Sequence, residues 1–93
     1  MRTIRRTNTF KRDYKREKKG PHRKTLDTNI VEIVAMLAAD EALPLRHHDH
    51  PLVGKWKDYR DCHIKPDLIL IYRKSVESTL DLVRLGSHSE LGL

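Results

Sequence analysis

A change of hydrophobic period near the middle of the chain constrains the fold more than any other feature. Apolar side chains first recur every three or four positions, as on one buried face of a helix, at Leu26, Ile30, Ile33, Val34 and Leu37. Later segments have the shorter period of strands, and Leu68–Tyr72 is apolar throughout, as expected for a central strand with two covered faces. Helices followed by strands indicate an α+β fold.

Turn and capping residues define the other predicted elements. Thr3–Arg6 can form a short edge strand, and Asn8 or Thr9 can cap a first helix that stops at Gly20-Pro21. A loop over Glu41–Pro51 follows the second helix. Three strands are then predicted, at Trp56–Ile64, Leu68–Lys74 and Thr79–Leu85.

These elements predict one domain spanning residues 1–93, because a chain of 93 residues has room for a single modest core. The expected order is β-α-α-β-β-β, with two N-terminal helices packed on one face of a small antiparallel sheet of about four strands. Residues that project from the opposite face would be free to form a site.

The charge balance favours a polyanionic partner. The net charge is +6, and the first quarter of the chain is rich in Lys and Arg against only Asp13 and Glu17. Each Lys or Arg that is placed near a phosphate releases a condensed counterion, which favours binding to nucleic acid. The same composition also fits a basic protein with no such partner, so charge alone does not decide the function.

Cysteine usage and hydropathy bear on the compartment. Cys62 is the only cysteine, which excludes an intramolecular disulfide and a CxxC zinc or redox motif, so we expect a cytoplasmic protein. The basic N-terminus is not followed by an apolar stretch, so no signal peptide is predicted. The longest apolar runs, Ile33–Ala39 and Leu68–Tyr72, fall far short of the ~20 residues that cross a bilayer.

Titratable side chains gather in the second half of the chain, in types that suit RNA cleavage without a metal. The 2′-hydroxyl can attack the adjacent phosphate if a base removes its proton, an acid protonates the departing 5′ oxygen and a cation steadies the phosphorane. Histidine serves as base or acid near neutral pH, and arginine binds phosphate oxygens with two donors. The candidates are His47, His48, Asp49, His50, Asp61, His63, Asp67, Arg84 and His88, with Asp61 and His63 on one strand face.

Each candidate also has a purely structural interpretation. The three loop histidines could be solvated, or could hold a metal together with Cys62 or His63, although Cys62 is expected to face away from His63. Asp61 could pair with an arginine, and Asp67 is a plausible turn residue. Trp56 suits a buried anchor as well as a base-stacking platform. The basic residues of the first helix region, Lys15, Arg16, Lys18 and Lys19, could form only a solvated face.

An ordered set of short motifs in the second half resembles the YafQ-type toxins of the RelE/ParE superfamily. The motifs are Asp49-His50-Pro51-Leu52, Gly54, Trp56-Lys57, Tyr59-Arg60-Asp61, His63, Pro66-Asp67, Ile69-Leu70-Ile71-Tyr72 and Arg84-Leu85-Gly86-Ser87-His88. The likeness covers essentially the whole chain. It implies a RelE-like fold and a ribosome-dependent endoribonuclease, a type II toxin that cleaves the mRNA codon in the A site of the 70S ribosome without a cofactor or metal.

The resemblance also implies roles for individual residues. His50 and His63 would act at the 2′-hydroxyl, as the base or its support, and His88 would be the acid or would stabilise the transition state. Asp61 and Asp67 would orient histidines and raise their basicity. Arg84 is assigned to the phosphate, Trp56 to support of the site, and the four basic residues Lys15, Arg16, Lys18 and Lys19 to ribosomal RNA.

The partners implied by the resemblance are the ribosome, its mRNA and a protein antitoxin, with operator DNA bound only through the antitoxin complex and no membrane. Relatives favour adenine-rich lysine codons and usually carry an aromatic residue shortly after the last histidine. Here the tail is Leu91-Gly92-Leu93, and a missing stack of ~1–3 kcal/mol would weaken codon binding or relax codon choice.

Two other functions remain open at this point. ParE-like relatives share the fold but inhibit DNA gyrase without enzymatic chemistry, and a degenerate member would keep only antitoxin and operator binding. The histidine and aspartate set argues against both alternatives, whereas the altered tail favours the second.

Overall fold

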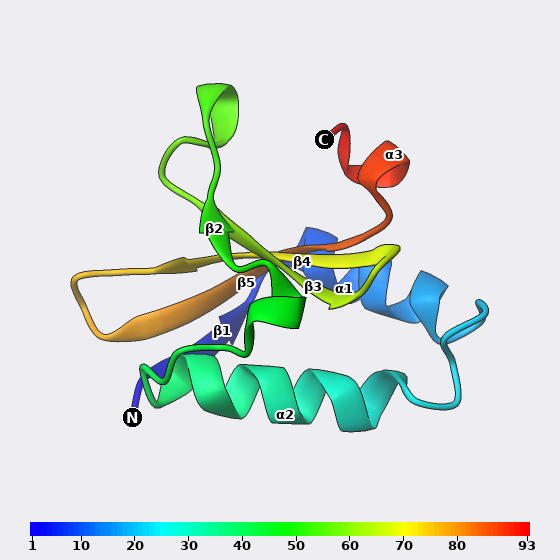
Figure 1. Cartoon of the computed structure of the whole chain (residues 1–93), viewed down its shortest axis with the longest axis horizontal. Helices are drawn as coiled ribbons and strands as arrows, with labels where there is room; N and C mark the ends of the chain where they lie inside the picture. Colours follow the sequence, from blue (N-terminus) through cyan, green and yellow to red (C-terminus); the bar gives the residue numbers. More distant parts are fainter.

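A mixed five-stranded sheet in the order β1-β5-β4-β3-β2 forms the centre of the computed structural model, which describes residues 1–93 (Figure 1). Its strands are β1 (Thr3–Arg6), β2 (His50–Pro51), β3 (Arg60–Lys65), β4 (Leu68–Lys74) and β5 (Thr79–Gly86). Every neighbouring pair is antiparallel except β1 and β5, which run parallel. The prediction of a purely antiparallel sheet is therefore wrong at this edge, because β1 joins β5 across nearly the whole chain and no hairpin sets its direction.

Two helices cover one face of the sheet, which confirms the predicted α+β arrangement. They are α1 (Asn8–Glu17) and α2 (Leu26–Ala38). Phe10 of α1 and Leu26 and Leu37 of α2 are buried against side chains such as Leu70 and Leu82. Helix α1 begins one residue earlier than predicted, because the Thr7 hydroxyl accepts a hydrogen bond from the Phe10 amide and caps the helix. None of the helices is both long and apolar enough to cross a membrane.

The segment before β3 differs from its prediction. The strand expected over Trp56–Ile64 starts only at Arg60, because Gly54–Trp56 forms a short 3₁₀ turn. The chain then turns back, and the Leu52 amide donates to the Tyr59 carbonyl oxygen at 3.0 Å. As a result, residues predicted to end a loop form the two-residue strand β2, which pairs with β3.

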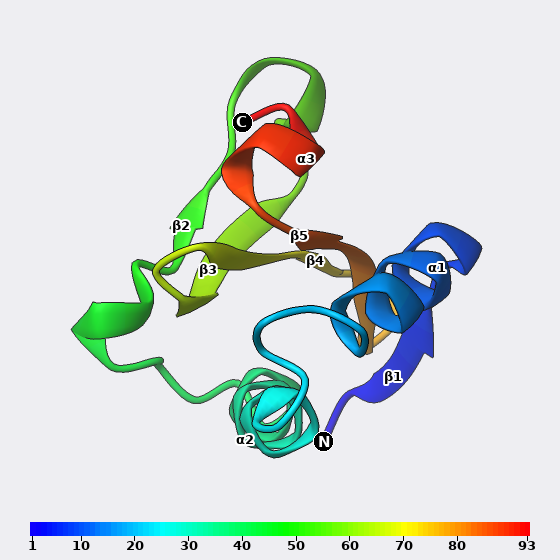
Figure 2. The same cartoon turned by 90° about the vertical axis from the view of Figure 1, so that its right-hand side faces the viewer.

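A second, smaller apolar cluster covers part of the opposite sheet face. The short helix α3 (His88–Leu91), which was not predicted, buries Leu91 against Ile69 and Ile71 of β4. Ser87 and Glu90 form a capping box that starts this helix. Figure 2 shows α3 above the sheet and α2 below it. The packing of α3 therefore determines where its first residue, His88, can lie.

Close packing at Gly86 holds α3 near α1. The Arg16 guanidinium donates to the Leu85 carbonyl oxygen at 2.8 Å and lies 3.0 Å from the Glu90 carboxylate. A Cβ on residue 86 would come within 2.8 Å of this guanidinium and 3.1 Å of Glu90. A side chain at residue 86 would therefore force the Arg16 guanidinium to shift from its present contacts.

We expect Gly86→Ala to destabilise the protein by about 1–3 kcal/mol, because it displaces the charged hydrogen bonds of Arg16. Urea unfolding followed by circular dichroism measures the change. Gly20→Ala is the matched control, because a Cβ there meets no atom closer than 3.5 Å. Equal stability of the two variants would show that the Arg16 link adds nothing to the fold.

Candidate active site

Four histidines meet on the sheet face opposite α1 and α2. His63 of β3 lies at their centre, with ring-centroid distances of 5.4 Å to His48, 6.5 Å to His50 and 5.2 Å to His88. The alternation of β3 places His63 on this face and buries Cys62 completely in the main core, as the sequence predicted. The structure thus brings together residues from the loop before β2, from β2, from β3 and from α3.

The pairing of β2 with β3 orients the His50 ring. His50 stands opposite Asp61 in the register, and its Nδ1 lies 3.1 Å from Asp61 Oδ1 and 2.5 Å from the His48 carbonyl oxygen. A carbonyl oxygen can only accept, so Nδ1 carries the proton and donates it. The Nε2 atom of neutral His50 therefore has a free lone pair, as a general base requires.

Asp61 supplies a buried negative charge beside this ring. Its side chain is only 4% exposed. The contact with His50 Nδ1 is within ion-pair distance but lacks hydrogen-bond geometry, so Asp61 Oδ1 has no hydrogen-bond partner in the chain. Burial raises the pKa of Asp61, and the nearby histidines counteract that shift. A protonated histidine would donate a hydrogen bond to the free oxygen. The Asp61 carboxylate therefore stabilises the protonated form of a neighbouring histidine.

His63 is shifted in the direction that keeps its ring neutral. Burial lowers the pKa of His63 most, the other three histidines lower it further, and the Asp61 carboxylate opposes them. His63 therefore stays neutral to a lower pH than a free histidine, whose pKa is about 6.5. A neutral ring between His50 and His88 can accept or relay a proton.

Three of the four histidines border an open hollow of about 400 Å³. Its lining consists of Arg46, His48, His50, His63 and Pro66. Such a wall offers a base, a cation and hydrogen-bonding rings to an anion, and no hydrophobic residue lines it. The arrangement suits a phosphodiester that enters from solvent.

Two predicted site residues have other partners. Asp67 lies in the turn between β3 and β4, is 71% exposed, and pairs with His22 Nε2 at 2.9 Å. Arg84 of β5 directs its guanidinium to Asp13 of α1 at 2.7 Å. Neither Asp67 nor Arg84 forms a hydrogen bond or an ion pair with any of the four histidines.

Trp56 has the geometry of a structural anchor. Its ring meets Tyr59 edge to face, with 5.3 Å between centroids, and packs against the second apolar cluster over Ile69 and Ile71. Its indole Nε1 is buried without a partner. The structure thus favours the anchor interpretation of Trp56 over the stacking one.

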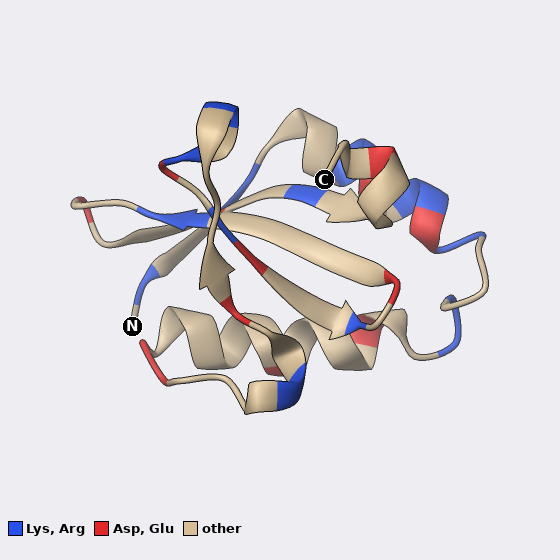
Figure 3. Cartoon of the chain, turned by 45° about the horizontal axis from the view of Figure 1, so that its top comes forward, with Lys and Arg blue, Asp and Glu red and all other residues tan.

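The four basic residues assigned to RNA divide into two pairs. Arg16 is bound by Asp13, Glu17 and Glu90, and Lys18 pairs with Asp27 at 2.8 Å. Lys15 and Lys19 are exposed and form no ion pair. Figure 3 shows the Lys and Arg positions of α1 interrupted by acidic ones. Of these four residues, only Lys15 and Lys19 carry a charge that no ion pair neutralises.

Sequence reasoning missed Arg46 and set aside His48 as a solvated loop residue or metal ligand. His48 reaches His63 because its backbone is left-handed, with φ of 45°, which no sequence pattern signals for a histidine. The residues proposed for a metal site do not lie together as ligands. Cys62 lies in the main core, and no group of three or more His, Cys, Asp or Glu side chains is placed to hold an ion.

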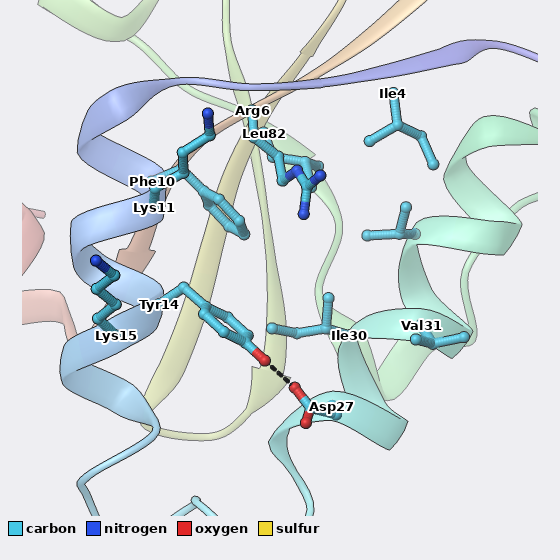
Figure 4. A pocket seen from close by; sticks show the side chains of 11 residues that line it. Ile4, Arg6, Phe10, Lys11, Tyr14, Lys15, Asp27, Ile30, Val31 and Leu82 are labelled. Atoms are coloured by element: carbon cyan, nitrogen blue, oxygen red, sulfur yellow. Dashed lines mark hydrogen bonds between the residues drawn. The ribbon is translucent and has the colours of Figure 1, made fainter.

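A second hollow of about 630 Å³ lies between α1, α2 and β1 (Figure 4). Its floor is apolar, with Phe10, Ile30 and Val34 among the lining residues, and Lys11 and Lys15 also line it. The Tyr14 hydroxyl donates to Asp27 across one end. This groove is separate from the histidine cluster, because α1 and α2 cover the other sheet face.

Known proteins match the chain along nearly its full length. A family model described as bacterial toxin of type II toxin-antitoxin system, YafQ, matches residues 2–92. The mRNA interferase toxin YafQ of Escherichia coli K12 is 37% identical over 90 residues, which are 95% of this chain and 97% of that protein.

Solved structures are similar to the same extent. A metal-bound toxin from Helicobacter pylori is 41% identical with a TM-score of 0.85, covering 98% of this chain and 99% of that one. The toxin in the Escherichia coli DinJ-YafQ complex is 34% identical with a TM-score of 0.82, and 98% of each chain is covered. The likeness therefore covers the fold along nearly the whole chain.

Proposed function

The chain belongs to the YafQ family of bacterial type II toxins, and on that premise we propose that it is an endoribonuclease that cleaves mRNA in the A site of the translating ribosome. The observation that carries the proposal is the His50 ring, which lines an open hollow and whose Nδ1 is held by the His48 carbonyl oxygen beside buried Asp61, so that Nε2 keeps its lone pair. This is the arrangement of an oriented general base beside an anion site.

We expect the reaction to proceed in the following way. His50 Nε2 removes the proton of the 2′-hydroxyl, and the resulting oxygen attacks the adjacent phosphorus. The bond between phosphorus and the 5′ oxygen breaks, and protonated His88 donates the proton that this oxygen needs. The products are a 2′,3′-cyclic phosphate and a 5′-hydroxyl. His63, 5.2 Å from the His88 ring and 6.5 Å from the His50 ring, supports both, and Asp61 stabilises the positive charge that His50 gains.

Asp67 and Arg84 take no part in the steps above. Both were assigned to the site from their chemistry, and both are paired elsewhere here, with His22 and Asp13. Roles in catalysis would require each to change partner when RNA binds, so these two assignments stay predictions.

A protein antitoxin is the second proposed partner, and operator DNA would be bound only through that complex. The Escherichia coli relative is seen in a DinJ-YafQ complex. In this chain the apolar groove between α1 and α2, with Lys11 and Lys15 in its wall, suits an amphipathic segment with acidic flanks. Because its substrate is translated mRNA, we place the protein in the cytoplasm.

The test maps mRNA 5′ ends in a reconstituted translation system, with and without ribosomes, for the intact protein and for His88→Ala. We expect cuts within A-site codons only when ribosomes are present, and a rate about 10²–10⁴-fold lower in the variant because it lacks the acid. Cuts in free RNA would contradict ribosome dependence. No cuts at all would favour gyrase inhibition or a degenerate toxin, and wild-type rates for His88→Ala would remove His88 from the mechanism.

A further inference from the structure

Arg46 is the one arginine or lysine in the wall of the hollow that His48, His50 and His63 border, here called the histidine hollow. We propose that Arg46 binds a phosphate group of the RNA beside His48, His50 and His63. The inference rests on the proposed endoribonuclease function and names the residue that holds the anionic part of its substrate.

The first support is that the charge of Arg46 is not neutralised within the protein. Beyond residue 24, every other arginine forms an ion pair: Arg60 with Asp49, Arg73 with Asp81 and Arg84 with Asp13. Arg46 is exposed and forms no hydrogen bond or ion pair through its side chain. An unpaired guanidinium beside three histidines presents its donors to whatever anion enters the hollow.

The second support is that the backbone carrying Arg46 is anchored to the sheet. Arg46 lies in the 3₁₀ turn Leu45–His47, and His47 Nδ1 donates to the His63 carbonyl oxygen at 2.8 Å. Three residues later, Asp49 accepts a hydrogen bond from the Tyr72 hydroxyl at 2.5 Å. These contacts tie the turn to β3 and β4, so the Arg46 side chain in the wall of the hollow extends from an anchored backbone.

Neighbouring charges do not provide a competing partner. Arg46 also lines a hollow of about 370 Å³ on its other side, together with Glu32 of α2 and Lys65 of β3. Glu32 is not within 4 Å of the guanidinium, since no ion pair joins them. A phosphodiester of the RNA, whose oxygens match the guanidinium fork, therefore meets no competing ion pair at Arg46.

The chemistry of the cleavage explains why a cation is needed at this place. Negative charge grows on the phosphate oxygens as the 2′ oxygen attacks, and a fixed donor there stabilises the transition state more than the ground state. Arg84 was the sequence-based candidate for this task, but its guanidinium is bound by Asp13. Arg46 provides the same fork from the wall of the hollow.

The test measures two quantities for the whole protein and for Arg46→Gln. The first is the single-turnover rate of codon cleavage on saturating ribosomes. The second is the dissociation constant for inorganic phosphate, taken from NMR shifts of the histidine rings in the free protein. Lys55→Gln is the matched control, because Lys55 is exposed, unpaired and outside the hollow.

We expect Arg46→Gln to slow cleavage about 10–100-fold, less than the 10²–10³ of a buried oxyanion donor because Arg46 is exposed. Phosphate binding should weaken at least several-fold, Arg46→Lys should recover part of both losses, and Lys55→Gln should match the wild type. The proposal is overturned if either quantity is unchanged in Arg46→Gln or changes equally in Lys55→Gln. An intact protein that binds phosphate through Arg46 but never cuts mRNA would contradict the proposed function and leave an anion site of another kind.

Discussion

We expect His50→Ala to lower the rate of mRNA cleavage about 10²–10⁴-fold, the usual contribution of a positioned general base. His50 is the histidine whose tautomer the structure determines, because Nδ1 must donate to the His48 carbonyl oxygen and Nε2 is left free. Its side chain is 49% exposed, so alanine leaves no large buried void and the fold should be kept. Quantifying cut 5′ ends in a single turnover on saturated ribosomes measures the loss.

Asp61→Asn tests the contribution of the Asp61 carboxylate separately from that of the His50 base. The amide keeps the size of the carboxylate but loses the charge that favours a protonated His50, so we expect a smaller loss than for His50→Ala. The carboxylate also raises the pKa of His63, so its removal should move the acidic limb of the rate profile to lower pH wherever His63 must be neutral. If His50→Ala cleaves at the wild-type rate, the base is His63 and not His50. If the pH profile of the rate is unchanged in Asp61→Asn, Asp61 contributes only to packing.

The sequence predicted well those elements whose apolar pattern shows which of their faces are buried. The predicted strand Leu68–Lys74 has the observed bounds, because its even positions pack under the helices while Ile69 and Ile71 pack under Leu91. The second helix was predicted from one apolar stripe, which is the face it buries.

Elements without such a pattern were missed. Strand β2 has two residues and α3 has four, too few for any period to appear. Both exist because of distant contacts: β2 pairs with β3, and Leu91 packs on β4. The parallel pairing of β1 with β5 has the same origin, since it joins segments from opposite ends of the chain.

The site shows the same division. Alternation along β3 predicted that Asp61 and His63 share a face, because that relation is local. Partner choice was not predictable: Arg84 was assigned to phosphate from its type, and nothing near it in sequence reveals a carboxylate 71 residues away. His48 and Arg46 depend on a left-handed residue and on a turn anchored to His63, both of which are tertiary features.

That distant carboxylate, Asp13, is the residue whose loss should destabilise the fold most. Its side chain is 4% exposed and accepts hydrogen bonds from Arg84 Nε at 2.7 Å, from the Leu85 amide at 3.0 Å and from Arg16 at 3.0 Å. Asp13→Ala leaves the Leu85 amide and the Arg84 guanidinium without their acceptor, whereas Arg16 keeps Glu17, Glu90 and the Leu85 carbonyl oxygen. We expect a loss of about 3–5 kcal/mol in the free energy of unfolding, a large share of the stability of a small domain.

Urea unfolding measures that loss, and Asp40→Ala is the matched control. Asp40 also pairs with two basic residues, Arg2 and Lys74, but its side chain is 57% exposed, so water replaces it and the loss should be far smaller. Equal losses in the two variants would contradict the role of burial. A stable Asp13→Ala would also show that Arg84 does not depend on Asp13 and is free to turn towards RNA.

The pH dependence of the free energy of unfolding measures the contribution of the Asp13 charge independently. Burial pushes the pKa of Asp13 up, but the hydrogen bonds from Arg84 and Leu85 and the charges of Arg84 and Arg16 outweigh it and hold the pKa below its ordinary value. A carboxylate with a lowered pKa stabilises the fold above its unfolded pKa of about 3.9, and this contribution disappears as the pH falls through the folded value. The stability gap between the wild type and Asp13→Asn should therefore be constant near neutral pH and should narrow below about pH 4. A gap that stays constant in acid would mean that Asp13 stabilises the protein by shape and hydrogen bonding alone, with no contribution from its charge.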